Sequence, residues 1–235
     1  MTIQDVFDGA QLLCESIATL RRNQLFLTMG DDFAEYAALV AQHRPDQPLG
    51  PPFDPAKKLL PRSKGMWVVG HNAAGQVVHT QAMRLLDLDD QTLAQYLQAR
   101  FHDFPPAGLD IDYDGSWFRP GPAAHRISGR VCYHGEMWLN DDSGVYRGRG
   151  IIDVLARVAF LTGLLHWQPD YVVGFMLRPV ARRGLAEREG YMHTDPYCLS
   201  WKVHGRNEPL DCNMVWMAGD DIRHVMHVPL DEVAA

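Results

Sequence analysis

The chain has 235 residues, a formal net charge of −7 and a hydrophobic fraction of 46%. The acidic balance argues against nucleic acid as a partner, because nonspecific binding to nucleic acid relies on a basic surface. No stretch reaches the length of a membrane span and the N-terminus carries no signal region, so we expect a cytoplasmic protein that does not bind membranes. The cysteines lack metal-ligand spacing, and no metal site is expected. A single domain over residues 1–235 is the simplest organisation.

The first part of the chain, residues 1–62, is predicted to form two helices and a proline-rich loop. Proline recurs between His43 and Ser63, which makes this loop stiff and suited to a lid or a partner surface. The runs Met66–His71 and Val77–Met83 then flank a glycine-containing loop, which is typical of a hairpin. The hairpin opens a predicted core over residues 66–217.

An insertion at about residues 89–122 follows the hairpin. It is predicted to hold a helix over Asp89–Phe101 and then a loop rich in proline and glycine that runs to Pro122. Trp117 and Phe118 lie in this loop, where the sequence is too irregular for a core strand, so we expect them to touch a substrate or a second subunit. The predicted partner, if any, is a second copy in a homodimer.

A strand over Arg130–Leu139 leads to a basic, glycine-containing turn and a long apolar helix from Ile151 to Trp167. The first N–H groups of a helix lack partners and lie at the positive end of the macrodipole, so glycines at 148 and 150 would let a phosphate approach them. Asp153 excludes a dinucleotide turn, and the chain has no P-loop tripeptide. The alternative is a turn whose arginines are merely solvated.

The remaining elements are a strand over Tyr171–Leu177, a charged surface helix over residues 181–189 that Gly190 stops, and a hairpin. The hairpin strands are Tyr197–Val203 and Asp211–Met217. The predicted order is therefore strand, glycine turn, buried helix, strand, short helix and final hairpin.

With this order the chain resembles the GCN5-related N-acetyltransferase (GNAT) superfamily. The cofactor signature of the family is similar to residues 147–152, although Ile152 replaces the expected small residue. Residues 136–139 look like the end of the family's fourth strand. Residues 185–191 look like the end of its fourth helix, with Ala186 in place of a tyrosine that often serves as general acid.

The resemblance implies an α/β fold with a mixed, mostly antiparallel central sheet that is flanked by helices and splayed in a V between strands 4 and 5. It implies an N-acetyltransferase that moves an acetyl or other acyl group from acetyl-coenzyme A, or another acyl-CoA, directly to the amine of a small molecule. The residues that it assigns to the cosubstrate are Met137, Trp138, Leu139, Arg147, Gly148, Arg149, Gly150, Ile151 and Ile152.

Catalysis by direct attack requires a base for the amine and an acid for the leaving thiolate. Glu136 is the first candidate for the base, and strand alternation predicts that His134 points to the same face. Tyr191 is a candidate for the acid, with Tyr197 and water as alternatives. An acceptor cleft lined by Trp67, Trp117 and Phe118 would attract an ammonium group through their aromatic faces.

Three other interpretations stay open. The departures at Ile152 and Ala186 suit a catalytically degenerate GNAT-fold regulator that binds a CoA ester. The insertion resembles the layout of acyl-homoserine lactone synthases, which are acyltransferases of the same fold. An interaction module without any ligand is the third. If the fold holds, part of the basic group at Arg178, Arg182, Arg183 and Arg188 lies near the adenine end of the cofactor.

Overall fold

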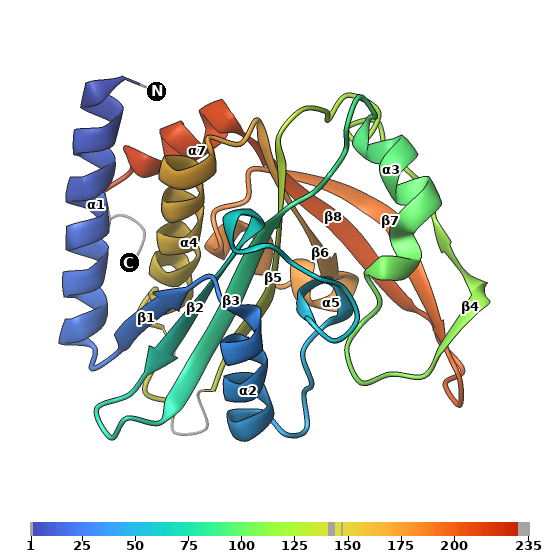
Figure 1. Ribbon diagram of the computed structural model, residues 1–235, viewed down its shortest axis with the longest axis horizontal. Helices are drawn as coiled ribbons and strands as arrows, with labels where there is room; N and C mark the ends of the chain where they lie inside the picture. The colour runs from blue at the N-terminus through green and yellow to red at the C-terminus, as the bar shows by residue number, and fades with distance from the viewer. Residues whose placement is uncertain (1, 141–143, 147, 230–235) are drawn as a thin grey trace.

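A computed structural model describes residues 2–140, 144–146 and 148–229 of the chain. Its strands form one sheet of eight in the order β1-β2-β3-β5-β6-β8-β7-β4. All neighbouring strands run antiparallel except β5 and β6, which are parallel (Figure 1). The strands are β1 (Phe26–Gly30), β2 (Gly65–His71), β3 (Val77–Leu85), β4 (Ile111–Phe118), β5 (Val131–Leu139), β6 (Tyr171–Leu177), β7 (His193–Val203) and β8 (Leu210–Ala218).

Helices cover both faces of this sheet (Figure 1). The mixed, mostly antiparallel sheet with flanking helices confirms the predicted fold class. The helices are α1 (Ile3–Arg22), α2 (Phe33–His43), α3 (Leu93–Arg100), α4 (Ile151–Trp167), α5 (Arg178–Ala181), α6 (Leu185–Arg188) and α7 (Gly219–Met226), and short 3-10 turns occupy Pro51–Phe53, Arg62–Lys64 and Phe101–Asp103.

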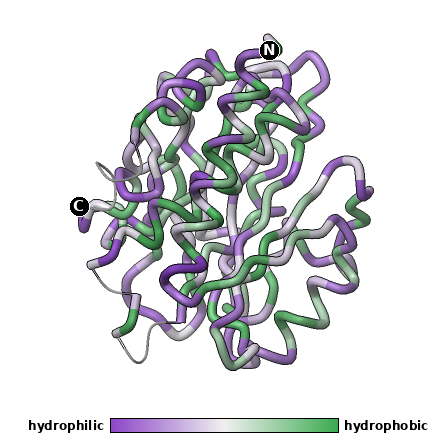
Figure 2. The backbone as a smooth tube through the Cα atoms, turned by 90° about the vertical axis from the view of Figure 1, so that its left-hand side faces the viewer, coloured by the Kyte–Doolittle hydropathy of each residue, from purple (hydrophilic) through white to green (hydrophobic). Residues whose placement is uncertain are grey.

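The described residues form three hydrophobic clusters, of which two lie on opposite faces of the sheet and the third joins α1 to α4. One is formed by α2, α3 and the turn at residues 51–53, with Tyr36, Phe53 and Trp201 among its buried members. The other is formed under α4 and α7, and Phe160 and Met83 belong to it. Figure 2, which faces the α1 side, shows hydrophobic and hydrophilic stretches alternating along the chain, as amphipathic elements require. None of the described helices is long and apolar enough to cross a bilayer.

The parallel pair β5 and β6 separates along its length. The two strands pair only over Val131–Tyr133 and Tyr171–Val173. Beyond these residues β5 continues to pair with β3, and β6 continues to pair with β8. The sheet therefore opens in a V between β5 and β6, which is the predicted splay between the fourth and fifth strands of the family pattern.

Three predictions about elements are wrong. Strand β1 lies where only two helices and a loop were expected, because a five-residue edge strand carries too short a pattern to be recognised. The inserted loop contains β4, an edge strand that pairs with β7. The expected charged helix over residues 181–189 is instead two single turns, α5 and α6, separated by Gly184 at a φ of 76°.

Candidate active site

A bulge in β5 decides where the two predicted catalytic side chains point. Glu136 has a φ of 59°, in the left-handed region, and the pairing of β3 with β5 shifts register between Thr80 and Ala82. A bulge inserts an extra residue and interrupts the alternation of side chains. Glu136 consequently reaches the face covered by α2, whereas His134 stays on the face covered by α4. The prediction that the two share a face is wrong.

The Glu136 carboxylate is held by two groups from the segment that follows α2. The Gly50 N–H donates to Oε1 over 2.9 Å, and Nη1 of Arg44 lies 3.2 Å from Oε2. Nη1 of Arg44 also donates to the Thr80 hydroxyl over 2.7 Å, and that hydroxyl donates to the Glu136 carbonyl over 3.0 Å. The bulge and its carboxylate are thus fixed by the N-terminal part of the chain.

Burial raises the pKa of Glu136, although the Arg44 charge and the Gly50 N–H oppose the change. A raised pKa makes a carboxylate a better base. An ionised carboxylate has about four lone-pair sites, so Glu136 can accept a further hydrogen bond beyond the two that it already accepts. An ammonium group that approaches Glu136 therefore has a proton acceptor available.

His134 belongs to a buried chain of hydrogen bonds. Nε2 of Gln81 donates to the Leu155 carbonyl over 2.7 Å, which turns Oε1 of Gln81 toward Nε2 of His134 at 3.2 Å. Because that oxygen can only accept, Nε2 carries the proton of His134. Burial lowers the pKa of His134 to about 3, so the ring is neutral and Nδ1 accepts from the Tyr191 hydroxyl over 2.9 Å. Both hydrogen-bonding positions of the imidazole are occupied.

Two cavities meet at the gap between β5 and β6. The first, here called the splay cavity, has a volume of about 280 Å³, and its lining includes Arg44 and Glu136 as well as His134 and Tyr191. The second, the aromatic cavity, has a volume of about 170 Å³ and lies on the α3 face. Three residues line both cavities: Glu136, Phe175 and Leu177. A group bound in one cavity can therefore reach a group bound in the other at Glu136.

The aromatic cavity is walled by rings that the sequence did not single out. They come from β5, β6, β7, the turn after α2 and the segment after α3. Tyr133 packs face-on to Phe53 with ring centroids 5.7 Å apart, and edge-on to Phe104 at 4.9 Å. The aromatic members of the wall are Phe53, Phe104, Tyr133, Phe175 and Trp201.

The glycine turn before α4 has the conformation that an anion site needs. Gly148 has a φ of 67° and Gly150, the N-cap of α4, a φ of 61°, both in the left-handed region that favours glycine. Among the described residues no side chain caps the helix at Gly150, and a Cβ at Gly148 would meet no atom within 4 Å. The Asp153 carboxylate accepts from its own backbone N–H, and the N–H groups before it at the start of α4 can donate to an external acceptor.

The other predicted cosubstrate residues lie in different settings. Arg149 is exposed and donates to the Asn23 side chain over 3.3 Å, whereas Ile151 is only 1% exposed and packs in the core. Ile152 is half-buried in the first turn of α4. Arg147 lies outside the described residues. On β5, Met137 lines the splay cavity, Trp138 lies under the Arg44 guanidinium, and Leu139 packs beside the core next to α4.

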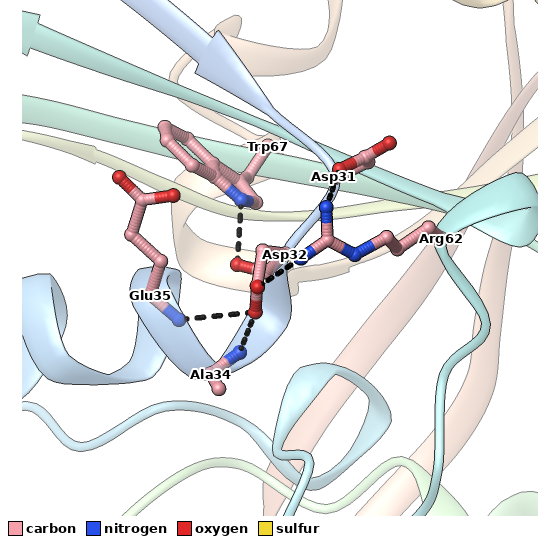
Figure 3. Close-up of polar contacts among 6 residues, drawn as sticks. All are labelled: Asp31, Asp32, Ala34, Glu35, Arg62 and Trp67. Atoms are coloured by element: carbon pink, nitrogen blue, oxygen red, sulfur yellow. Dashed lines mark hydrogen bonds and ion pairs between the residues drawn. The ribbon is translucent and has the colours of Figure 1, made fainter.

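Trp67 lies in the core rather than in a cleft, and Figure 3 shows its indole N–H directed at the Asp32 carbonyl. Its side chain is 3% exposed and stacks on Tyr36 with centroids 5.7 Å apart. The indole N–H donates to the Asp32 carbonyl over 3.0 Å, beside the Asp32 carboxylate that caps α2 through the N–H groups of Ala34 and Glu35. Trp67 lines neither cavity, so the structure does not bring it to the expected acceptor site.

Trp117 and Phe118 end the edge strand β4. They pair with Ser200 and Leu199 of β7. Trp117 is 36% exposed under the Arg119 guanidinium, and Phe118 packs beside the α2 and α3 core. Neither side chain lines either cavity. The expectation of an irregular substrate loop is not met, because these two residues belong to a strand.

Glu189 is a buried carboxyl that the sequence analysis passed over. It follows α6, is 3% exposed and lines the splay cavity together with Tyr191. Burial raises its pKa to about 8 against the opposing charge of Arg188. The sequence signal was weak, because Glu189 lies among charged residues that are typical of a solvated helix face.

The basic group on α5 borders a further hollow. Arg178 lies 3.6 Å from the Asp211 carboxylate and 4.0 Å above the Tyr197 ring. Arg182 and Arg183 are exposed at the same hollow, which has a volume of about 430 Å³. Arg178 is paired with Asp211. Among the described residues, Arg182 and Arg183 are therefore the two cations of this hollow that have no ion-pair partner.

Comparisons with known proteins give no match to a protein-family model and none among curated sequences. Among solved structures the chain is similar to a spermidine N-acetyltransferase from Vibrio cholerae, with 10% identity and a TM-score of 0.46 over 84% of this chain and 95% of the other. It is also similar to a putative phosphinothricin N-acetyltransferase, with 12% identity and a TM-score of 0.42 over 83% and 98%.

An N-acetyltransferase from Staphylococcus aureus Mu50 is similar in the same way, with 8% identity and a TM-score of 0.45 over 83% of this chain and 98% of the other. These are resemblances of backbone arrangement.

Proposed function

We propose that this protein is an acyltransferase that binds an acyl-CoA, such as acetyl-CoA, in the gap between β5 and β6 and transfers the acyl group to the amine of a small molecule. The observation that carries the proposal is the pair of cavities that share Glu136, Phe175 and Leu177 beside the gap between β5 and β6. Direct transfer needs a donor and an acceptor that meet at one point. Two cavities with a shared wall provide that meeting point.

The donor fits the splay cavity and the start of α4. The uncapped N–H groups after Gly150 suit the pyrophosphate, because a helix N-terminus favours an anion. The free edges of β5 and β6 beyond Tyr133 and Val173 suit the amides of the pantetheine arm, since an extended ligand can pair with an exposed strand edge. Arg149 adds a positive charge beside the turn.

The acceptor fits the aromatic cavity. Its rings offer an apolar wall with negative faces, and an ammonium group beside such faces gains roughly 0.5–2 kcal/mol for each good contact. Glu136 supplies the one carboxylate among the residues of that wall. A small amine, held by rings and paired with Glu136, would lose its proton to that carboxylate before it attacks the carbonyl carbon.

One observation favours a second function. Glu136 already accepts hydrogen bonds from Gly50 and Arg44, which suits a structural carboxylate as well as a base. A regulator that binds a CoA ester and does not turn it over would keep the splay cavity and lack a working acceptor site. Binding of acetyl-CoA without turnover would identify such a regulator.

The experiment measures binding first and turnover second. Acetyl-CoA should raise the melting temperature of the protein, because a ligand that binds only the native state stabilises it. Adenosine 3′,5′-bisphosphate, which lacks the pantetheine arm, should raise it less. Release of free thiol with a panel of primary amines then tests transfer. Absence of any stabilisation by acetyl-CoA contradicts the proposal, and stabilisation without thiol release supports the regulator.

A further inference from the structure

The polar side chains that line the splay cavity are Arg44, His134, Glu136, Glu189 and Tyr191. Four of them are already engaged. Arg44 and Glu136 contact each other, and the Tyr191 hydroxyl donates to His134, whose remaining N–H faces Gln81. These four groups therefore already have protein partners, although Glu136 can accept a further hydrogen bond and Nε of Arg44 has no partner among the described residues.

Glu189 differs from the other four. Its side chain is 3% exposed, and none of the described residues makes a hydrogen bond to its carboxyl. The chain keeps a helical conformation at Glu189, with φ of −72° and an N–H that donates to the Leu185 carbonyl over 2.9 Å. Residues three apart on a helix share a face, so Glu189 lies one turn beyond the buried Ala186. A carboxyl that borders a cavity and has no hydrogen-bond partner among the described residues can pair with a group of a ligand bound there.

We propose that Glu189 is the general acid that protonates the leaving coenzyme A thiolate in the splay cavity. This inference rests on the proposed function. The amine nitrogen bonds to the thioester carbon and the carbon–sulfur bond breaks, which leaves the electron pair on sulfur. Glu189 gives its proton to that sulfur. The ammonium group has lost one proton to Glu136 before the attack, and the second N–H proton passes to water as the amide forms. Exchange with water restores both carboxyls, so that of the two protons lost by the ammonium group one ends on the thiol and one is released to water.

The state of Glu189 before the reaction supports this role. Because burial raises its pKa to about 8, the group holds its proton at neutral pH, and this pKa is close to the value of about 8.5 for an ordinary thiol. Tyr191 is the rival donor, but burial and the neighbouring Glu189 raise its pKa well above the usual value. A phenol that holds its proton so tightly is the weaker acid.

The first test measures protons taken up when coenzyme A binds, by calorimetry at pH 8.5 in buffers of different ionisation enthalpy. When a thiol and a carboxyl share one site, loss of the second proton is suppressed, so the pair holds more protons than the separated groups. Wild-type protein should take up more protons with coenzyme A than with desulfo-coenzyme A. Glu189→Gln should abolish that difference. An equal difference in Glu189→Gln and wild type overturns the assignment.

The second test uses turnover with an amine from the panel. Glu189→Gln should lower kcat by about 10²-fold, with little change in the KM for acetyl-CoA, and should remove the fall of kcat near pH 8. Glu189→Asp should keep that fall at a reduced kcat. Glu187→Gln is the control for the same substitution at an exposed position, since Glu187 lies on the neighbouring helix α6 and lines neither cavity. Wild-type kcat and pH profile in Glu189→Gln overturn the assignment.

The two tests distinguish an error in the assignment of Glu189 as general acid from an error in the proposed function. If coenzyme A gives no heat with wild-type protein, the proposed function fails and the assignment falls with it. If coenzyme A binds and Glu189→Gln behaves as wild type in both tests, only the assignment is overturned.

Discussion

The Arg44 guanidinium and the Glu136 carboxylate lie 3.2 Å apart at the bulge of β5, and both side chains are less than 10% exposed. Arg44 follows the last residue of α2, at the start of the proline-rich segment, so the pair ties that segment to the centre of the sheet. Gly50, six residues further on, donates to the same carboxylate. The segment predicted to be a lid or a partner surface thus positions the candidate base.

Removal of Arg44 alone should destabilise the protein strongly. Arg44→Met leaves Glu136 buried without its counter-charge, and removing one partner of a buried pair typically costs about 3–5 kcal/mol. Urea denaturation gives the free energy of unfolding. The double variant Arg44→Met with Glu136→Gln should recover much of the loss, because no buried charge remains. Arg22→Met, at an exposed helix position, is the control. A loss below about 1 kcal/mol would contradict this prediction and would mean that another group compensates the Glu136 charge.

Glu136→Gln tests the candidate base directly. The glutamine side chain is nearly isosteric with glutamate and can still accept from the Gly50 N–H, so coenzyme A binding should change little, whereas stability should fall because the buried Arg44 guanidinium loses its counter-charge. Turnover should fall by about 10²-fold or more, which is the usual contribution of a general base. Steady-state rates and isothermal titration of coenzyme A measure the two effects separately. Turnover near the wild-type level would assign Glu136 to structure alone.

The stability of the protein should depend on pH through Glu189. Its pKa of about 8 in the folded protein lies above the value of about 4.3 for an unfolded glutamate, so between these values the folded state holds a proton that the unfolded state has lost. The free energy of unfolding should therefore fall as the pH rises through this window, by at most about 1.4 kcal/mol per pH unit.

The measurement is a series of urea titrations between pH 5 and 9 on wild type, Glu189→Gln and the exposed control Glu187→Gln. Glu189→Gln should flatten the profile, and Glu187→Gln should follow wild type. Since other groups also titrate in this range, the contribution of Glu189 is obtained from the difference between the pH profiles of wild type and Glu189→Gln. Parallel profiles for Glu189→Gln and wild type would show that the Glu189 carboxyl is ionised throughout.

The sequence predicted those parts of the fold that local patterns determine. Strands β2, β3, β5 and β6 and helix α4 carry long β-prone or apolar runs, and each was placed within a few residues. The glycine turn before α4 was found because a left-handed φ at Gly148 and Gly150 leaves a clear residue signature. Edge strand β4 was missed, since proline and glycine on both sides made it look like a loop.

The candidate site was harder to predict because its contacts join distant segments. Glu136 and His134 were found from their strand, but their directions were not, since the bulge that separates them depends on pairing with β3. Arg44 lies 92 residues before Glu136 in sequence, and no local pattern links the two. The aromatic wall of the second cavity also joins segments that are distant in sequence, because Phe104 and Trp201 meet there only after the sheet has formed.

The glycine turn should bind the pyrophosphate of coenzyme A mainly through its backbone. Gly150→Val adds a side chain at the start of α4, where no side chain caps the helix, and should weaken coenzyme A binding more than Arg149→Ala does. The valine side chain would exclude several contacts between the backbone and the pyrophosphate, whereas truncation of the arginine removes one contact. A valine at a φ of 61° is also strained, so part of any loss could come from instability. Gly75→Val serves as the control, since Gly75 has a φ of 77° in the β2–β3 hairpin with no atom within 4 Å of an added Cβ. Isothermal titration should show weaker coenzyme A binding in Gly150→Val and wild-type binding in Gly75→Val. Equal affinity in Gly150→Val and wild type would place the cosubstrate away from α4.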